Sequence, residues 1–449
     1  MKILLVQPPR PLAHSYKFPP LSLGYLASNL TAHGYQVEVM DMDAEDASVE
    51  VFPDRFSGQT FDYAIVAITS ATVSYPAAVR IANYAKALNK SCLTVIGGPH
   101  VSFLARETLD EAKSIDVVVK GEGEQALVEI AHAVEHRVEF QDIAGIVYRE
   151  GSLPVETPNR PLEKDLDSLP PPDWNLFPMD LYLAPTVIAS RGCPRRCIYC
   201  AATSIHRGFR QRQLEPLMRE IRGLKKWVDR TPNRQLTFFD NSFAGDYSYS
   251  LRLAQAIKET RIEANWTAEM RADNVDGPLL DAMKSSGCVY IHYGIESGSQ
   301  RILDSIGKGI SIEKAIQIVE MTLERGIEVA CSFCVGHPEE TFETIDATKR
   351  IIKRLQEMGV HCSTSIVTPF PGTELWEDSE RYGLTIANVP WQKYTLYNPV
   401  MSTRWLSRED IGRAFAELLV DTHAYTELDR IRQTSERFAD RRKKVEADA

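Results

Sequence analysis

Three cysteines, Cys193, Cys197 and Cys200, lie within eight residues of one another in a chain of 449 residues. This spacing lets a single loop bring three thiolates around one centre. A structural zinc site needs four protein ligands, usually with a second close pair of Cys or His, and the nearest further candidate is His206. Iron–sulfur clusters are also held by closely spaced thiolates, and a cluster with only three would keep one iron open. The spacing indicates a metal centre, and an open iron would mean chemistry rather than scaffolding.

A second close pair, Cys331 and Cys334, could supply further thiolates. Both lie in a run that favours an extended strand, in which residues three apart point to opposite faces. This argues against both joining the metal centre. One of them could face a substrate cavity of the barrel, but we favour core packing for both, as for the isolated Cys92, Cys288 and Cys362. Eight cysteines in a chain of this size do not make a disulfide framework. In a reducing compartment a tight group of cysteines is typical of metal binding or catalysis.

The composition is that of a globular protein, with 44% hydrophobic residues, 25% charged residues and a formal net charge of −10. This acidic balance argues against a nucleic-acid partner, which would favour a basic face. The apolar start of the chain is too short for a signal peptide. No apolar run approaches the roughly 18 residues of a membrane span. We therefore expect a cytoplasmic protein.

The elements that must position the cysteines begin with a separate amino-terminal domain. Residues 1–145 alternate short apolar runs with helical patterns, which predicts an α/β fold with a doubly wound parallel sheet of the Rossmann-like kind. The expected strands are Ile3–Val6, Gln36–Met40, Tyr63–Ile68, Leu93–Ile96 and Val117–Val119. Such a sheet binds ligands beyond the carboxyl ends of its strands, where glycines let a bulky ligand approach the backbone. The candidate residues there are Pro8, Ser70, Gly97, Gly98, His100, Gly121 and Glu122.

The cysteine loop belongs to a second domain. Residues 146–184 are polar and proline-rich, which predicts a linker. Residues 185–385 then alternate again, which predicts a (β/α)6 partial barrel with function at the carboxyl ends of its strands. The expected strands are Pro185–Ala189, Gln235–Phe239, Asn265–Ala268, Val289–Tyr293, Val329–Cys334 and Ser363–Val367, and the cysteines follow the first of these. Residues 386–449 predict a small helical extension on the substrate side and a charged tail from Asp429.

The pattern C-x-x-x-C-x-x-C, with the aromatic Tyr199 before its last cysteine, resembles the signature of the radical S-adenosylmethionine (SAM) superfamily. In that superfamily the three thiolates hold a [4Fe–4S] cluster whose open iron chelates the amine and carboxylate of SAM. One electron cleaves the sulfonium, and the resulting 5′-deoxyadenosyl radical abstracts a hydrogen atom from the substrate. The resemblance therefore implies an enzyme whose cofactors carry the hard chemistry. It also implies an external electron donor such as flavodoxin or ferredoxin.

The ends of the next strands resemble the SAM-binding motifs of that superfamily. Phe238-Phe-Asp-Asn-Ser242 stands where a Gly-Gly-Glu motif usually contacts the methionine amine, and this departure leaves the role to Asp240 or Asn241. The resemblance implies Arg271 as a partner of the methionine carboxylate, with a surface ion pair as the alternative. The remaining implied contacts are Glu296 and Ser297 to the ribose, and the loops of Gly336 and Pro371 to the adenine.

The amino-terminal domain resembles the cobalamin-binding domain fused to one large radical SAM subgroup. The resemblance runs through Phe18–Tyr25, Gly97–His100 and Gly121–Glu124 and, with the barrel, covers nearly all of residues 1–385. It implies cobalamin at the strand ends named above. The D-x-H-x-x-G motif, which supplies a lower cobalt ligand in other cobalamin domains, is replaced by Gln7-Pro-Pro-Arg-Pro-Leu12. For His100 we therefore favour a hydrogen-bonding or structural role over cobalt ligation.

Together these resemblances imply a cobalamin-dependent radical SAM enzyme acting on a small-molecule or natural-product substrate. The leading hypothesis is methylation of an unactivated carbon centre, with methylcobalamin as the methyl donor. The alternative is radical oxidation, cyclisation or rearrangement in the same architecture. A methylthiolating enzyme is disfavoured because the amino-terminal domain has only Cys92. A non-catalytic metal-binding module would hold zinc or no labile iron.

Overall fold

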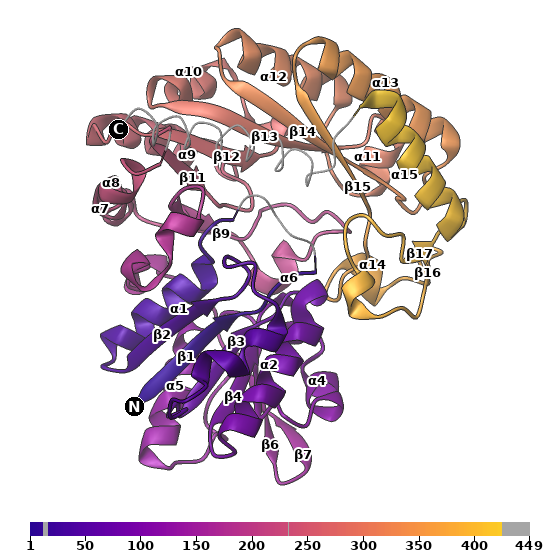
Figure 1. Ribbon diagram of the computed structural model, residues 1–449. Helices are drawn as coiled ribbons and strands as arrows, with labels where there is room; N and C mark the ends of the chain where they lie inside the picture. Colours follow the sequence, from indigo (N-terminus) through magenta and orange to yellow (C-terminus); the bar gives the residue numbers. More distant parts are fainter. Residues whose placement is uncertain (12–16, 232, 424–449) are drawn as a thin grey trace.

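The computed structural model describes residues 1–11, 17–231 and 233–423, which form two α/β domains (Figure 1). In the view of Figure 1 the amino-terminal domain lies below and the barrel lies above it. The predicted charged tail from Asp429 lies outside the described residues.

The amino-terminal sheet is parallel through its first five strands, in the order β2-β1-β3-β4-β5. These strands are β1 (Lys2–Gln7), β2 (Gln36–Asp41), β3 (Ile65–Thr69), β4 (Leu93–Gly97) and β5 (Val117–Val119). The helices are α1 (Leu21–Ala32), α2 (Tyr75–Leu88), α3 (Pro99–Phe103), α4 (Ala105–Glu111) and α5 (Glu124–His136). Along β1, Ile3 and Leu5 join the core under α1 and α5, whereas Leu4 and Val6 join the core under α2 and α4. Burial on both faces explains why these strands are continuously apolar.

A hairpin that we had assigned to the linker extends this sheet. β6 (Ile146–Glu150) pairs antiparallel with β5, and β7 (Leu153–Glu156) pairs antiparallel with β6. The turn between them contains Gly151, whose φ of 60° lies in the left-handed region that favours glycine. β6 is stabilised by pairing with β5, which lies about thirty residues earlier in the chain. Its short apolar run, flanked by polar residues, therefore gave no local indication of a strand. The expectation that the first domain ends at residue 145 is corrected by this hairpin.

The second domain is a partial barrel of six parallel strands in the order β15-β14-β13-β12-β11-β8. The strands are β8 (Thr186–Val187), β11 (Gln235–Phe238), β12 (Asn265–Met270), β13 (Cys288–Glu296), β14 (Glu328–Val335) and β15 (His361–Ile366). The helices are α7 (Leu214–Gly223), α8 (Lys225–Val228), α9 (Tyr247–Thr260), α10 (Gly277–Ser285), α11 (Gln300–Ser305), α12 (Ile312–Glu324) and α13 (Phe342–Glu357). This architecture confirms the predicted (β/α)6 arrangement.

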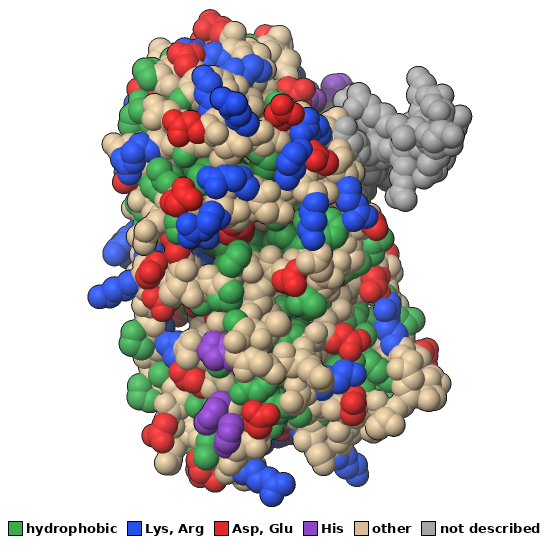
Figure 2. Space-filling model, turned by 90° about the vertical axis from the view of Figure 1, so that its left-hand side faces the viewer, with side chains coloured by type: hydrophobic (Ala, Val, Ile, Leu, Met, Phe, Trp, Pro, Cys, Tyr) green, Lys and Arg blue, Asp and Glu red, His purple; other side chains and the backbone are tan. Residues whose placement is uncertain are grey.

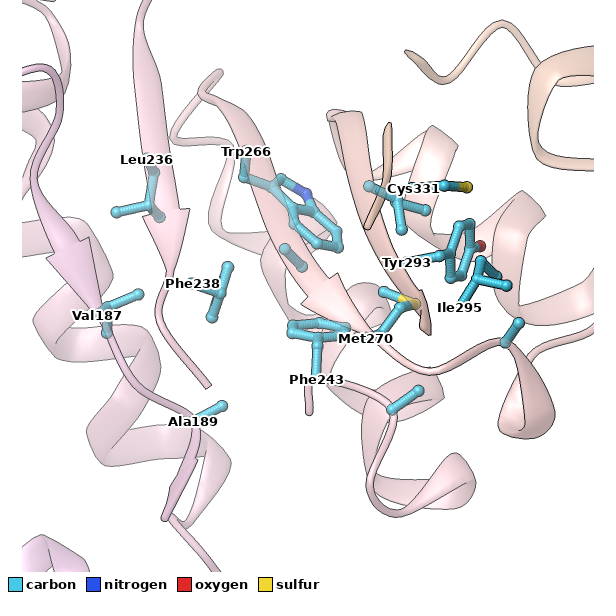
Figure 3. Close-up of a cluster of buried hydrophobic side chains, with 14 of the residues drawn as sticks. Val187, Ala189, Leu236, Phe238, Phe243, Trp266, Met270, Tyr293, Ile295 and Cys331 are labelled. Atoms are coloured by element: carbon cyan, nitrogen blue, oxygen red, sulfur yellow. The ribbon is translucent and has the colours of Figure 1, made fainter. Parts of the chain in front are cut away.

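Aromatic side chains fill the core beside the first barrel strands (Figure 3). The ring of Trp266 lies with its centroid 5.4 Å from that of Phe238 and 5.1 Å from that of Phe243. Cys331 lies in the same buried cluster, as predicted. Edge-to-face and tilted contacts of this kind stabilise the core beyond their area burial, so the ends of β11 and β12 stand on a rigid base.

A small carboxyl-terminal region completes the fold. It contains α14 (Glu374–Glu377), the strand pair β16 (Thr385–Ile386) and β17 (Met401–Ser402), and α15 (Arg408–Thr422), which packs against α13. A small helical region after the barrel was expected.

The two domains meet tightly at a loop that follows β15. A Cβ atom added to Gly372 would lie 2.2 Å from the ring of Phe103 in α3. Nearby, the rings of His100 and Trp391 lie 4.7 Å apart at their centroids. The barrel and its extension are therefore packed directly on the amino-terminal domain.

The surface carries interspersed charges. Figure 2 shows the face that lies on the left in Figure 1, where Lys and Arg side chains gather among acidic ones in the upper half. On α7 and α8, Arg219 pairs with Glu215 and Lys225 pairs with Asp229, which offsets the local positive charge. No helix within residues 1–11, 17–231 and 233–423 is long and apolar enough to cross a membrane.

Candidate cluster and cofactor site

The three cysteines of the predicted metal loop line one cavity of about 530 Å³. The loop runs from β9 (Ser190–Arg191) to α6 (Ala202–His206). Desolvation by the surrounding protein, and then the neighbouring thiolates of Cys197 and Cys193, raise the pKa of the Cys200 thiol, although the residue as a whole is exposed. Within the described residues, no three Cys, His, Asp or Glu side chains converge closely enough to hold a single metal ion together. The three thiols thus share a cavity without converging on one point. If they ionise, their negative charges repel one another unless a cationic metal lies between them.

Asp240 and Asn241, which follow β11, hold the start of the cysteine loop. The Asp240 carboxylate accepts hydrogen bonds from the Ala189 backbone N–H at 3.2 Å and from the Ser190 hydroxyl. The amide oxygen of Asn241 accepts from the Gly192 N–H at 3.1 Å. Burial raises the pKa of Asp240 to about 6. The Asp240 carboxylate thus fixes the start of the cysteine loop, and its contact with the methionine amine stays a prediction.

Arg271, at the end of β12, lies beside the loop. Its guanidinium forms a two-pronged ion pair with Asp273, at 2.9 and 3.0 Å. Another nitrogen lies 3.6 Å from the Cys197 sulfur. The ion pair is buried rather than on the surface and touches the cysteine loop, and a contact of Arg271 with the methionine carboxylate stays a prediction.

Glu296, at the end of β13, is the buried centre of a polar row. Its Oε1 lies 2.8 Å from the Lys308 ammonium, which lies 3.4 Å from the Tyr199 hydroxyl. Its Oε2 lies 3.4 Å from the Cys334 sulfur. Burial alone would raise the pKa of Glu296, but Lys308 holds it below its usual range. Cys334 packs against the hydrophobic core, as predicted, and its thiol also reaches this polar row.

Glu296 also has an unusual backbone conformation. Its φ of 75° is in the left-handed region, which costs a non-glycine residue energy and is concentrated at functional sites. A Cβ at Gly294 would lie 2.6 Å from Glu296 Oε1, so glycine leaves room for the carboxylate. The structure thus places this side chain at some cost inside the barrel.

The other residues expected to contact SAM differ in their surroundings. The buried Ser297 hydroxyl lies 3.2 Å from that of Thr348 in α13, so it ties two elements together. Gly336 packs against Ile411 of α15. Pro371 is buried next to Gly372, in the loop that contacts Phe103 of the first domain. These placements favour structural contacts for Ser297 and Pro371.

Two buried side chains beside Gly336 were not indicated by the sequence patterns. Both ring nitrogens of His337 lack a hydrogen-bond partner among the described residues, and burial lowers its pKa to about 4. The Glu340 carboxylate accepts hydrogen bonds from the backbone N–H groups of Gly336 and His337, and burial raises its pKa to about 8. The sequence signal that could have identified them is a histidine and a glutamate in the loop directly after an apolar strand.

A second cavity, of about 420 Å³, lies at the carboxyl edge of the amino-terminal sheet. Gly97, Gly98, Gly121 and Glu122 line it, as predicted. At Gly98 φ is 112°, and a Cβ would lie 2.5 Å from the Ser70 carbonyl oxygen. The edge is thus a smooth backbone cradle of a size typical of ligand pockets.

Three predicted residues of this edge are buried away from the cavity. Pro8 and Ser70 pack behind it, and the backbone of Ser70 lies against Gly98. His100 points between Tyr75 and Trp391, and its Nδ1 lies 3.3 Å from the Thr72 hydroxyl. These contacts hold the His100 ring between two elements, and its role toward a cofactor stays a prediction.

Glu122 lines this cavity, and its carboxylate is paired with basic side chains of the barrel domain. It accepts hydrogen bonds from Arg210 at 3.0 Å and from His206 at 3.2 Å, and Arg191 lies 3.5 Å away. The neighbouring Glu124 pairs with Arg191 at 2.6 Å. Burial would raise the pKa of Glu122, but these partners lower it to about 2. The cluster joins the two domains beside the cysteine loop.

A Glu122→Gln variant tests this ion cluster. The lowered pKa, against a usual value of about 4.3, corresponds to about 3 kcal/mol of stability at neutral pH. That stability is present above the usual pKa and is lost as pH falls toward 2. We expect the difference in unfolding midpoint between wild type and variant to shrink by about half between pH 7 and pH 3. The exposed Glu150→Gln is the control, and a difference that does not change with pH would contradict the assignment.

Helix α6 separates the two cavities. Its residues Thr203 and Ser204 line the cysteine cavity, and Ile205 and His206 line the cavity on the first sheet. One turn of helix therefore divides the two sites.

The comparisons with known proteins agree with this arrangement. A family model described as the radical SAM superfamily matches residues 187–352, and one for the B12 binding domain matches residues 13–131. The chain is 34% identical to an uncharacterized methyltransferase, PH0819, from Pyrococcus horikoshii, over 92% of this chain and 90% of that protein. It is 27% identical to an anaerobic magnesium-protoporphyrin IX monomethyl ester cyclase from Rubrivivax gelatinosus, over 88% of this chain and 72% of that protein.

Among solved structures, the radical SAM methyltransferase TsrM from Kitasatospora setae, with cobalamin and a [4Fe–4S] cluster bound, has the same fold. Its TM-score is 0.72 at 19% identity, over 92% of this chain and 85% of that chain. The fold and the site define a radical SAM enzyme with a cobalamin-binding domain. The chain belongs to the radical SAM superfamily, in the group that carries a B12-binding domain, together with the Pyrococcus horikoshii protein.

The residues present fit the cofactors of this group, which are a [4Fe–4S] cluster, SAM and cobalamin. Three thiols without other ligands in one cavity suit a cluster with an open iron. The glycine-lined edge of the first sheet suits a large ligand that approaches the backbone. The sequence after β1 lacks the D-x-H-x-x-G motif, so that motif supplies no histidine to cobalt.

Proposed function

We propose that the protein methylates an unactivated carbon centre of a small-molecule substrate. The observation that carries this proposal is the shared wall of the two cavities, a single turn of α6. Methylcobalamin in the cavity of the first sheet and the cluster with SAM in the cysteine cavity would then lie close together. Both would be within reach of one substrate.

The names of the relatives support methyl transfer. The Pyrococcus horikoshii protein, which matches this chain over nearly its whole length, is described as a methyltransferase, as is TsrM. The cyclase relative favours the second candidate, a radical oxidation or cyclisation without methyl transfer. The test below separates the two.

When bound, the cluster supplies electrons for cleavage of SAM, and cobalamin supplies a methyl carrier. The chain's own residues would do the positioning. Cys193, Cys197 and Cys200 would hold the cluster, and Asp240 would keep their loop in place. Glu296 would accept hydrogen bonds from the ribose, and Gly98 and Gly121 would let the corrin approach the backbone.

Two partners follow from this chemistry. Reductive cleavage needs an electron that the described protein does not supply, so an external donor such as flavodoxin or ferredoxin would deliver it. The substrate would be a small molecule or natural product that reaches the site beside residues 386–423. A cytoplasmic location and the lack of a nucleic-acid partner remain part of the same proposal.

The test does not require the substrate. Protein reconstituted without oxygen with iron, sulfide and hydroxocobalamin is reduced and given SAM with a deuterated methyl group. Recovery of the labelled methyl with the corrin, and of S-adenosylhomocysteine in equal amount, is expected. Formation of 5′-deoxyadenosine with no label on the corrin would overturn methyl transfer in favour of the second candidate.

A further inference from the structure

The turn of residues 306–309 lies along the back of the cysteine loop. The Ile198 backbone N–H donates to the Ile306 carbonyl at 3.2 Å, and the Cys197 sulfur lies 3.8 Å from the Gly307 carbonyl. Gly307 and Gly309 both have positive φ, at 66° and 65°. The two glycines let the chain reverse tightly at Lys308, and this turn sets the direction in which the Lys308 side chain leaves the backbone.

Lys308 links this turn to the residue expected to bind SAM. Its side chain is 5% exposed and pairs with Glu296 at 2.8 Å, while the same ammonium lies 3.4 Å from the Tyr199 hydroxyl. Its carbonyl accepts a hydrogen bond from Arg271, which contacts Cys197. Lys308 thus contacts Tyr199 and the Glu296 carboxylate directly, and is linked to Cys197 through Arg271.

A buried ion pair is expensive to form, and replacing it with apolar residues often stabilises a protein. The strained backbone of Glu296 and the glycine at 294 add to that cost. A functional role at the site would account for this cost.

We propose that Lys308 is a positioning residue that couples SAM binding at Glu296 to the order of the cluster loop. The inference rests on the proposed binding of SAM and a cluster, but not on methyl transfer. Lys308 keeps Glu296 ionised and directed, and through Tyr199 it fixes the segment before Cys200. Binding of SAM should therefore tighten the loop, and a tight loop should improve SAM binding.

The charged and titratable groups that face Glu296 are Lys308, Cys334, His337, Tyr199 and, farther off, Cys200. Lys308 is the main group that holds the pKa of Glu296 down against burial. Without the ammonium, that pKa should rise, so that the carboxyl is neutral at low pH and ionised at higher pH.

The experiment measures SAM binding and iron retention in reconstituted protein without reductant, so that no turnover occurs. For Lys308→Met we expect SAM binding to weaken as the pH falls from 8.0 to 6.5, beyond any change in wild type, because a raised pKa of Glu296 protonates its carboxyl at the lower pH. SAM should slow the loss of iron to a chelator in wild type and in Lys308→Arg, but not in Lys308→Met. The exposed Lys314→Met is the matched control.

A double variant separates this role from simple destabilisation. Glu296→Gln with Lys308→Met removes both charges, so the extra pH dependence should disappear while iron content is kept. If Lys308→Met binds SAM as wild type does at both pH values and SAM still protects its iron, the coupling is wrong. If wild-type protein itself fails to bind SAM, the proposed cofactor assignment fails instead.

Discussion

A Cys193/Cys197/Cys200→Ala triple variant, reconstituted without oxygen, keeps a corrin spectrum but shows no iron–sulfur absorption and does not cleave SAM. The expected loss is complete because these are the thiols that line the cysteine cavity, and a cluster cannot be held without its thiolate ligands. The corrin is expected to remain because its cavity lies on the other side of α6. Absorption spectra and iron and sulfide analysis check the result.

Cys334→Ser is the matched control, because this thiol also lies in the barrel but contacts Glu296 and Ser365. It should keep the iron–sulfur band. Retention of iron in the triple variant, or zinc in place of iron in the wild type, would contradict the assignment of the loop.

The second large effect is expected at the other cavity. In Gly98→Ala the added Cβ would lie 2.5 Å from the Ser70 carbonyl oxygen and 2.8 Å from its nitrogen, at a φ of 112°. Backbone strain of this kind costs about 1–3 kcal/mol. Relieving it must push Gly98, which lines the cavity, away from Ser70, so corrin binding should weaken by about tenfold to a hundredfold. The cluster should be unaffected. Titration with hydroxocobalamin, followed by absorption, measures both.

A Gly34→Ala variant separates the effect of backbone strain at a positive φ from the effect of a collision between the added Cβ and its neighbours. Gly34 also has a positive φ, of 85°, but nothing lies within 4 Å of an added Cβ. We expect this variant to bind the corrin as wild type does. Equal binding by the Gly98 variant would show that the crevice does not hold the cofactor at this strand end.

The sequence was sufficient to predict the two sheets. Short runs of β-branched and aliphatic residues marked β1 to β5 and the barrel strands, since strands buried on both faces are apolar throughout. The β6–β7 hairpin was missed because its stability comes from pairing with β5, which no local pattern reports. The three-cysteine loop was recognised from spacing alone, since its ligands lie within one short segment.

The partners of individual side chains were harder to predict. Asp240 and Arg271 were expected to face a ligand, but Ser190 and Asp273 satisfy them. These partners come from loops whose relative position depends on how barrel strands align. Lys308 gave only the weak signal of a lysine between two glycines. Sequence spacing thus identifies ligands within one loop, whereas charge pairing between loops requires the folded structure.

The contact between Gly372 and Phe103 limits how the two domains can move. Because not even a methyl group fits between them, we expect that neither domain can slide along the other at this point without first separating. Any opening that admits a substrate should then be a rotation that pivots here.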